Sequence, residues 1–247
     1  MAEKLLSKKE KRAERKKRHA KAPVLDRKAD SIEKKKKILI VGEGVHTEPS
    51  YFEKFREPGV HVVAIGLGEG TRKLVHDVES HKRAEEEKLG FTFDEVWVAF
   101  DKDSFPDFGQ AISEAKAKGY HVAFSNQAIE YWFILHFMDH QGAAMARDTY
   151  ADTLNGLLKS IESGFQYDPD SKVVTDEFFN VLYKRIQNAY DRADKVYSFK
   201  CQNGASTEES VTTIYLLVKS ILGLVSTSEK RETEKKLESM RKAGVLN

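Results

Sequence analysis

Two short apolar runs in this chain end in acidic residues, and these acids are the first candidates for chemistry. Residues 38–41 are Ile-Leu-Ile-Val and lead into Gly-Glu-Gly, which contains Glu43. Residues 96–100 are Val-Trp-Val-Ala-Phe and lead into Asp101 and Asp103. Because residues two apart in an extended segment point the same way, both aspartates can face one ion. Carboxylates gathered in this way repel one another unless a cation lies between them, and their hard oxygen atoms suit Mg²⁺, with Mn²⁺ as the alternative.

Three further residues extend the candidate site, each with a structural alternative. Glu48 is expected to bind the same metal, or else to stabilise the dipole at the start of a helix. Glu130 lies among apolar residues, so its charge needs a metal, a lysine or backbone amides as a partner; the alternative is that it caps its helix. His136 is either a proton donor to a leaving group or a core histidine bonded to a carbonyl.

The elements that position these residues follow from the alternation of apolar runs and helical patterns. We expect strands at residues 37–41, 61–65, 95–100 and 120–124, and helices at 47–55, 71–89, 108–118 and 129–138, with Thr47 and Asn126 as helix caps. This alternation predicts an α/β protein with a parallel sheet between helices. Open sheets of this class hold their ligands at the carboxyl ends of the strands, which is where Glu43 and Asp101 fall.

The rest of the chain divides by its composition. Residues 148–163, 176–193 and 208–224 have amphipathic helical patterns without a strand signal of comparable strength. We therefore expect an α/β domain at 37–140, a helical subdomain at 141–225 and a charged tail at 226–247.

Charge is distributed unevenly behind a net value of +2. Residues 1–37 carry 16 basic and 6 acidic side chains, whereas the remainder carries a net charge of −8. We expect residues 1–36 to form a basic disordered arm that attracts polyanions such as nucleic acid, with a solubilising tail as the alternative.

Several other classes of protein are excluded by sequence. A single cysteine, Cys201, excludes an internal disulfide and a cysteine-based zinc site. The chain contains neither a Gly-Lys-Ser/Thr phosphate loop nor a dinucleotide fingerprint. No apolar run approaches the roughly 20 residues that a membrane span needs, so we expect a cytoplasmic protein that does not enter a membrane.

Three blocks of sequence resemble one family, the RloB-like proteins, which are Toprim-type proteins of bacterial restriction and abortive-infection loci. The resemblance spans about residues 37–224. The blocks are Ile-Leu-Ile-Val-Gly-Glu-Gly at 38–44 with Thr-Glu-Pro-Ser-Tyr-Phe at 47–52, then Phe-Asp-Lys-Asp at 100–103, then Ser-Asn at 125–126 with Glu-Tyr-Trp at 130–132 and His-Phe at 136–137. The chain departs from the family pattern at Gly42, where a cysteine is frequent, and at Gln127, where a proline is frequent.

The resemblance implies a Toprim fold with the metal site at Glu43 and the pair Asp101 and Asp103. In related Toprim nucleases the glutamate takes part in acid/base chemistry while the aspartates hold Mg²⁺. Proteins of this family are commonly encoded beside an ATPase of the SMC or ABC type, which would be a partner here.

Together these observations predict a Mg²⁺-dependent nuclease effector of a bacterial phage-defence system that hydrolyses phosphodiester bonds in DNA or RNA. The alternative is a non-catalytic Toprim subunit that binds nucleic acid or a partner and works with an ATPase.

Overall fold

The computed structural model describes residue 9, residues 35–102, 107–205 and 207–225, and residue 235. Contacts divide the chain into two compact units, Met1–Lys34 and Lys35–Asn247, and the second unit carries the fold described here. Most of the predicted arm, Asp103 and most of the predicted tail therefore lie outside the described residues. Strand β1 begins at Lys36, inside the range predicted for the arm.

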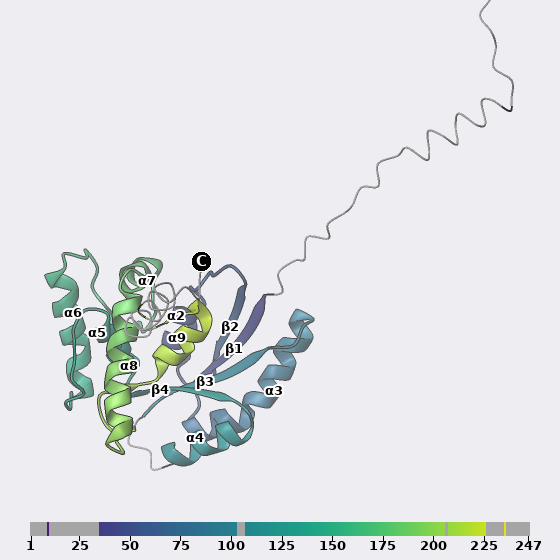
Figure 1. Cartoon of the computed structure of the whole chain (residues 1–247), viewed down its shortest axis with the longest axis horizontal. Helices are drawn as coiled ribbons and strands as arrows, with labels where there is room; N and C mark the ends of the chain where they lie inside the picture. Colours follow the sequence, from purple (N-terminus) through teal and green to yellow (C-terminus); the bar gives the residue numbers. More distant parts are fainter. Residues whose placement is uncertain (1–8, 10–34, 103–106, 206, 226–234, 236–247) are drawn as a thin grey trace, which may run out of the picture. The chain divides into compact units, whose positions relative to one another are not determined.

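A five-stranded sheet forms the centre of the second unit (Figure 1). Its strands are β1 (Lys36–Gly42), β2 (Val60–Gly66), β3 (Glu95–Asp101), β4 (His121–Asn126) and β5 (Val211–Thr212). They lie in the order β2-β1-β3-β4-β5, and the first four are parallel. Strand β5 pairs with β4 in the antiparallel direction. The predicted α/β class and parallel sheet are confirmed.

The central strand β1 is apolar throughout because both of its faces are covered, as is usual in parallel sheets. Ile38 and Ile40 belong to one buried cluster, and Leu39 and Val41 belong to another on the opposite face. The alternation places every second side chain in the same core. Register with β3 pairs Gly42 with Ala99, so the segments after both strands leave the sheet at the same edge.

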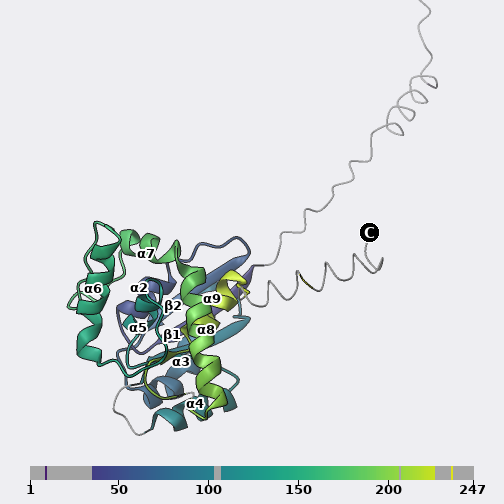
Figure 2. The ribbon, with the colours of Figure 1, turned by 60° about the vertical axis from the view of Figure 1, so that its left-hand side comes forward.

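Helices cover both faces of the sheet (Figures 1 and 2). One layer contains α3 (Thr71–Leu89) and α4 (Phe108–Ala117), which share the cluster around Leu39. The other layer packs around Ile38 and contains α2 (Thr47–Phe52), α5 (Glu130–Leu135), α6 (Tyr150–Ser160), α7 (Asp176–Tyr183), α8 (Ile186–Gln202) and α9 (Ile214–Leu222). A short 3₁₀ helix, η1 (Arg147–Thr149), precedes α6. Among the described residues, no helix has the length and apolar character needed to cross a membrane.

The structure differs from the sequence prediction in the C-terminal half. The helix predicted at 208–224 is shorter, because its first part forms β5. Thr212 pairs with Ser125 through their hydroxyl groups at 2.7 Å, and Thr213 Oγ1 accepts a 2.8 Å hydrogen bond from the Phe124 backbone N–H. These β-branched residues suit a strand, and the pairing ties the last helix to the sheet.

Other predicted boundaries also need correction. The helix predicted at 176–193 is divided into α7 and α8 by a turn in which Arg185 N–H bonds to Leu182 O at 2.8 Å. Thr47 is the first residue of α2 and not its cap, and α5 is preceded by Ile129 and not by Asn126. The segments after residue 140 contribute to the same buried cluster as strand β1.

Candidate functional site

Glu43 follows β1 in a loop where backbone segments approach closely. Its Oε2 accepts a 3.1 Å hydrogen bond from the hydroxyl of Thr71, the first residue of α3. A Cβ atom added to Gly44 would lie 2.2 Å from Glu48 Oε2, and one added to Gly66 would lie 2.1 Å from the Gly44 carbonyl oxygen. The approach at Gly66 is to backbone, so it requires glycine, and the contact at Gly44 places the Glu48 carboxylate against the segment that carries Glu43.

Glu48 lies in the first turn of α2 and is 4% exposed. Burial, together with the negative charges of Glu130 and Glu43, raises the pKa of its carboxyl group to about 7. Backbone N–H groups of Glu48 and Gly44 oppose this rise by hydrogen bonding to the carboxylate. A carboxyl group with this pKa is poised to exchange a proton for a cation near neutral pH.

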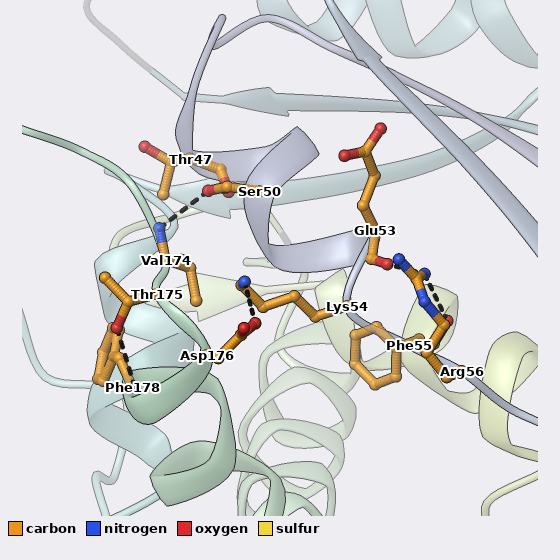
Figure 3. Close-up of polar contacts among 10 residues, drawn as sticks. All are labelled: Thr47, Ser50, Glu53, Lys54, Phe55, Arg56, Val174, Thr175, Asp176 and Phe178. Atoms are coloured by element: carbon orange, nitrogen blue, oxygen red, sulfur yellow. Dashed lines mark hydrogen bonds and ion pairs between the residues drawn. The ribbon is translucent and has the colours of Figure 1, made fainter.

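The position of α2, and hence of Glu48, is fixed by the segment that enters α7 (Figure 3). Ser50 Oγ accepts a 2.9 Å hydrogen bond from the Val174 N–H and donates to Thr47 O. One turn further along, Lys54 Nζ lies 2.5 Å from Asp176 Oδ1. These contacts hold α2 and the turn that follows it against residues that are more than a hundred positions away in the sequence.

Asp101 ends β3 and faces the same group of carboxylates. Burial raises the pKa of Asp101 well above its usual value, and the charges of Glu48, Glu130 and Glu43 add to this effect. Arg147 lowers the pKa, because its guanidinium nitrogen lies 3.7 Å from Asp101 Oδ2. The site therefore collects negative charge that Arg147 offsets only in part.

Glu130 is the first residue of α5 and has a partner that the sequence did not suggest. Its Oε1 accepts a 2.7 Å hydrogen bond from the hydroxyl of Tyr167. The backbone of Tyr167 is held by Asn155, whose amide oxygen accepts from Tyr167 N–H at 2.7 Å and whose amide nitrogen donates to Tyr167 O at 3.0 Å. Burial and the charge of Glu130 raise the pKa of Tyr167, so the hydroxyl stays protonated and donates.

His136 lies in the core, away from the carboxylates. Its ring is 1% exposed, Nδ1 lies 2.9 Å from Trp132 O, and the ring packs edge-on against the Trp132 indole. Burial lowers the pKa of His136 to about 3, so the ring is neutral at physiological pH. A neutral, enclosed imidazole is a poor proton donor to a leaving group, and we leave His136 out of the proposed chemistry.

The structure thus brings together four of the predicted site residues, Glu43, Glu48, Asp101 and Glu130, from four separate segments. Their oxygen donors, and the raised pKa values of Glu48 and Asp101, fit a hard divalent cation. Within the described part of the chain, however, no three or more such side chains form a ready-made metal-ligand group. Asp103, the remaining predicted ligand, lies outside the described residues.

Sequence analysis missed three contributors to the site: Thr71, Arg147 and Tyr167. Thr71 directly follows a glycine-rich turn after β2, and this position could have indicated that its side chain lies near the strand ends. Arg147 and Tyr167 lie in irregular segments of the helical half, where no periodicity marks them. Their proximity to Asp101 and Glu130 arises from tertiary packing alone.

Comparison with known proteins identifies the family. The family model described as RloB-like protein matches residues 38–221, which include all four carboxylates of the site. No curated protein and no solved structure matches the chain. Since the matched region covers most of the sequence and all five strands, the chain belongs to the RloB-like protein family.

Proposed function

We propose that this protein is a nuclease that hydrolyses phosphodiester bonds in DNA or RNA with the help of a bound Mg²⁺ or Mn²⁺ ion. The observation that carries the proposal is the convergence of Glu43, Glu48, Asp101 and Glu130 at one edge of the sheet, with a raised pKa at both Asp101 and Glu48. A cation bound among these acids would relieve the repulsion that raises the pKa values of Glu48 and Asp101.

Each acid has a role that follows from its surroundings. Asp101 and Glu48, whose carboxyl groups have raised pKa values, would hold the ion, with Asp103 as a further ligand. Glu43 and Glu130 are half-buried, as Asp101 is, so solvent reaches these carboxylates. Glu43, oriented by Thr71, would act as a ligand or as the general base, and Glu130, oriented by Tyr167, would complete the shell.

When bound, the ion supplies an activated water and neutralises the charge that develops on the phosphate. The chain itself supplies the orientation of the acids and the exclusion of water around them. Gly44 allows the backbone to lie close to the Glu48 carboxylate, and Gly66 allows the loop that contains Gly44 to pack against β2. The motifs shared with RloB-like proteins support a place in phage defence, with the cut nucleic acid as the toxic outcome and an SMC- or ABC-type ATPase as the partner that controls it.

A different observation favours the alternative, a non-catalytic subunit that binds nucleic acid or a partner protein. The described carboxylates do not form a ready-made ligand group, as a rigid metal centre would. In that case the acids would bind a cation or a basic partner without chemistry.

One experiment separates the two functions. Supercoiled plasmid and transfer RNA are incubated with the purified protein, with and without its ATPase, in Mg²⁺, Mn²⁺ or EDTA. We expect cleavage that requires the metal and is lost in Asp101→Asn and Glu43→Gln, whereas Asp94→Asn is active because Asp94 bonds to the Lys37 N–H in a different part of the protein. The nuclease assignment would be rejected if the wild-type protein cleaved nothing either with or without the ATPase. It would also be rejected if all variants cleaved equally.

A further inference from the structure

Arg147 is placed between the carboxylate site and solvent. It is the first residue of η1, and its backbone N–H donates a 3.0 Å hydrogen bond to Gln127 Oε1, which fixes the start of its side chain. Its guanidinium lies 3.7 Å from Asp101 Oδ2. The Arg147 side chain is 44% exposed, whereas that of Asp101 is 18% exposed, so the arginine reaches into the site from its rim.

A substrate phosphate would be repelled by the negative charge of this site. Four carboxylates carry more negative charge than one divalent cation neutralises, and the incoming phosphodiester adds another. The nearby ammonium of Lys102 is directed to the Thr207 carbonyl oxygen at 2.5 Å. Arg147 is the cation that acts on Asp101, and its planar group can donate two parallel hydrogen bonds to a phosphate.

The contact between Arg147 and Asp101 is suited to exchange. At 3.7 Å, and with its side chain 44% exposed, Arg147 makes a long contact with Asp101 from the solvent side of the site. A cation bound to Asp101 would take over the neutralisation that Arg147 now supplies. The guanidinium could then turn to another anion without leaving a buried charge behind.

We propose that Arg147 binds the phosphate of the nucleic acid next to Asp101, and that it moves from Asp101 to this phosphate when a divalent cation occupies the carboxylates. This inference rests on the proposed function for its substrate class. It adds a substrate-binding residue from the helical half of the protein, in a segment that no sequence motif marked.

The test measures binding separately from cleavage. Fluorescein-labelled oligonucleotides of DNA and RNA are titrated with wild type, Arg147→Ala and Arg147→Lys in Ca²⁺, and anisotropy is followed over a range of salt concentrations. We expect Arg147→Ala to weaken binding about tenfold and to reduce the slope of log K against log salt by about one, because one phosphate contact is lost. Arg147→Lys should restore the slope but only part of the affinity.

Arg83→Ala is the matched control, because Arg83 is exposed and pairs with Glu79 at 2.9 Å, three turns along α3 from Thr71. Calorimetric titration with Mn²⁺ should show that Arg147→Ala binds metal at least as tightly as wild type. Equal oligonucleotide affinity and slope in Arg147→Ala, Arg83→Ala and wild type would overturn the inference, as would loss of Mn²⁺ binding in Arg147→Ala. A wild-type protein that binds but never cuts would reject the nuclease, while weaker binding by Arg147→Ala would still support the role of Arg147.

Discussion

Tyr167 and Glu130 are joined by a 2.7 Å hydrogen bond between the tyrosine hydroxyl and Oε1 of the carboxylate. The tyrosine comes from the segment between α6 and α7, and the glutamate begins α5. Asn155 on α6 binds the backbone of Tyr167 on both its N–H and its carbonyl oxygen. The helical half of the protein thereby sets the orientation of a carboxylate that interacts with Asp101 and Glu48 at the sheet edge.

Replacing Tyr167 with phenylalanine removes this one bond and keeps the ring. We expect divalent-metal affinity to fall about tenfold, since groups that orient metal ligands typically contribute that much. The free energy of unfolding should fall by about 1.5 to 3 kcal/mol, the usual range for a hydrogen bond to a charged group. Calorimetric titration with Mn²⁺ and urea denaturation measure the two effects.

Tyr183→Phe is the control, because Tyr183 donates a 2.6 Å hydrogen bond to Glu57 at the protein surface. It should leave Mn²⁺ affinity unchanged. If Tyr167→Phe binds Mn²⁺ as wild type does, Glu130 is not oriented for a metal and its bond to Tyr167 serves the fold alone.

Glu48 gives a prediction about pH in the absence of metal. Its folded-state pKa of about 7 lies above the ordinary value of 4.5, so the folded state holds the proton more tightly than the unfolded chain does. Stability from this group is therefore present below pH 4.5 and is lost as the pH rises through 7. Glu48→Gln removes the penalty, and the metal-free variant should be more stable than wild type at pH 8 by about 1 to 3 kcal/mol.

Adding Mg²⁺ at pH 8 should make wild type more stable than Glu48→Gln. Wild type gains stability because the ion binds only the folded protein, whereas Glu48→Gln gains less. Urea denaturation at pH 4.5 and pH 8, with EDTA or with Mg²⁺, gives all four comparisons. A wild-type protein that is equally stable with EDTA and with Mg²⁺ at pH 8 would remove the reason for placing a cation beside Glu48.

His136 gives the opposite pH dependence. Its pKa of about 3 in the folded protein lies below the ordinary value of 6.5, so the unfolded chain takes up a proton first as the pH falls. Stability from the neutral ring is present above pH 6.5 and is lost toward pH 3, which amounts to about 2 to 3 kcal/mol at pH 4.5. The stability difference between wild type and His136→Gln should shrink by this amount between pH 7 and pH 4.5.

The same variant tests the chemistry. Because the ring is buried against Trp132, His136→Gln should lower stability at pH 7 but retain metal-dependent cleavage once folded. If the His136→Gln protein folds but has no activity, His136 would again be a candidate proton donor to the leaving group.

The sheet and the acids at its edge were predictable because their signals are local. Residues 38–41 and 96–100 are continuous apolar runs, which buried parallel strands require, and the acids follow them directly. Glu130 was identified as a charge among apolar helix neighbours, and Glu48 as an acid in the first turn of its predicted helix. The convergence of these acids follows from topology, since parallel neighbouring strands end at one edge.

The parts that were missed depend on contacts between distant residues. Strand β5 contains only two residues, and it is held by the pairing of Thr212 with Ser125, 87 positions earlier. A strand this short has no periodicity of its own, so the helical pattern of the residues that follow it determined the prediction. Tyr167 reaches Glu130 across 37 positions from a segment without periodicity. For His136 the sequence left two alternatives, and only the burial of the ring distinguishes them.

Ser50 tests whether the attachment of α2 matters for the site (Figure 3). Ser50→Ala leaves the Val174 N–H without its partner at 2.9 Å, and we expect a loss of about 1 kcal/mol or more in the free energy of unfolding. Because α2 carries Glu48, Mn²⁺ affinity should fall as well. Ser80→Ala is the control, since Ser80 also bonds to a carbonyl oxygen three residues earlier, at 2.7 Å, but accepts no bond from a distant segment.

Removal of the basic N-terminal segment should weaken nucleic-acid binding without abolishing chemistry. The deletion must stop at residue 34, because Lys36 begins β1 and its ammonium lies 2.7 Å from Glu95 and 2.6 Å from the Ser220 hydroxyl. Residues 1–34 carry a net charge of +7, so their loss should flatten the salt dependence of oligonucleotide binding. The carboxylates remain, so the cleavage rate at saturating substrate should stay the same.

A version with residues 2–34 in scrambled order separates charge from sequence. Attraction of a polyanion depends on the net charge and not on the order of residues, so the scrambled protein should bind with the affinity and salt slope of wild type. If the scrambled protein behaves like the deletion, the segment recognises its target through specific contacts. If the deletion itself binds with unchanged affinity and slope, the basic segment is a solubilising tail, and the positive charge that attracts nucleic acid must come from the folded unit, with Arg147 as its first candidate.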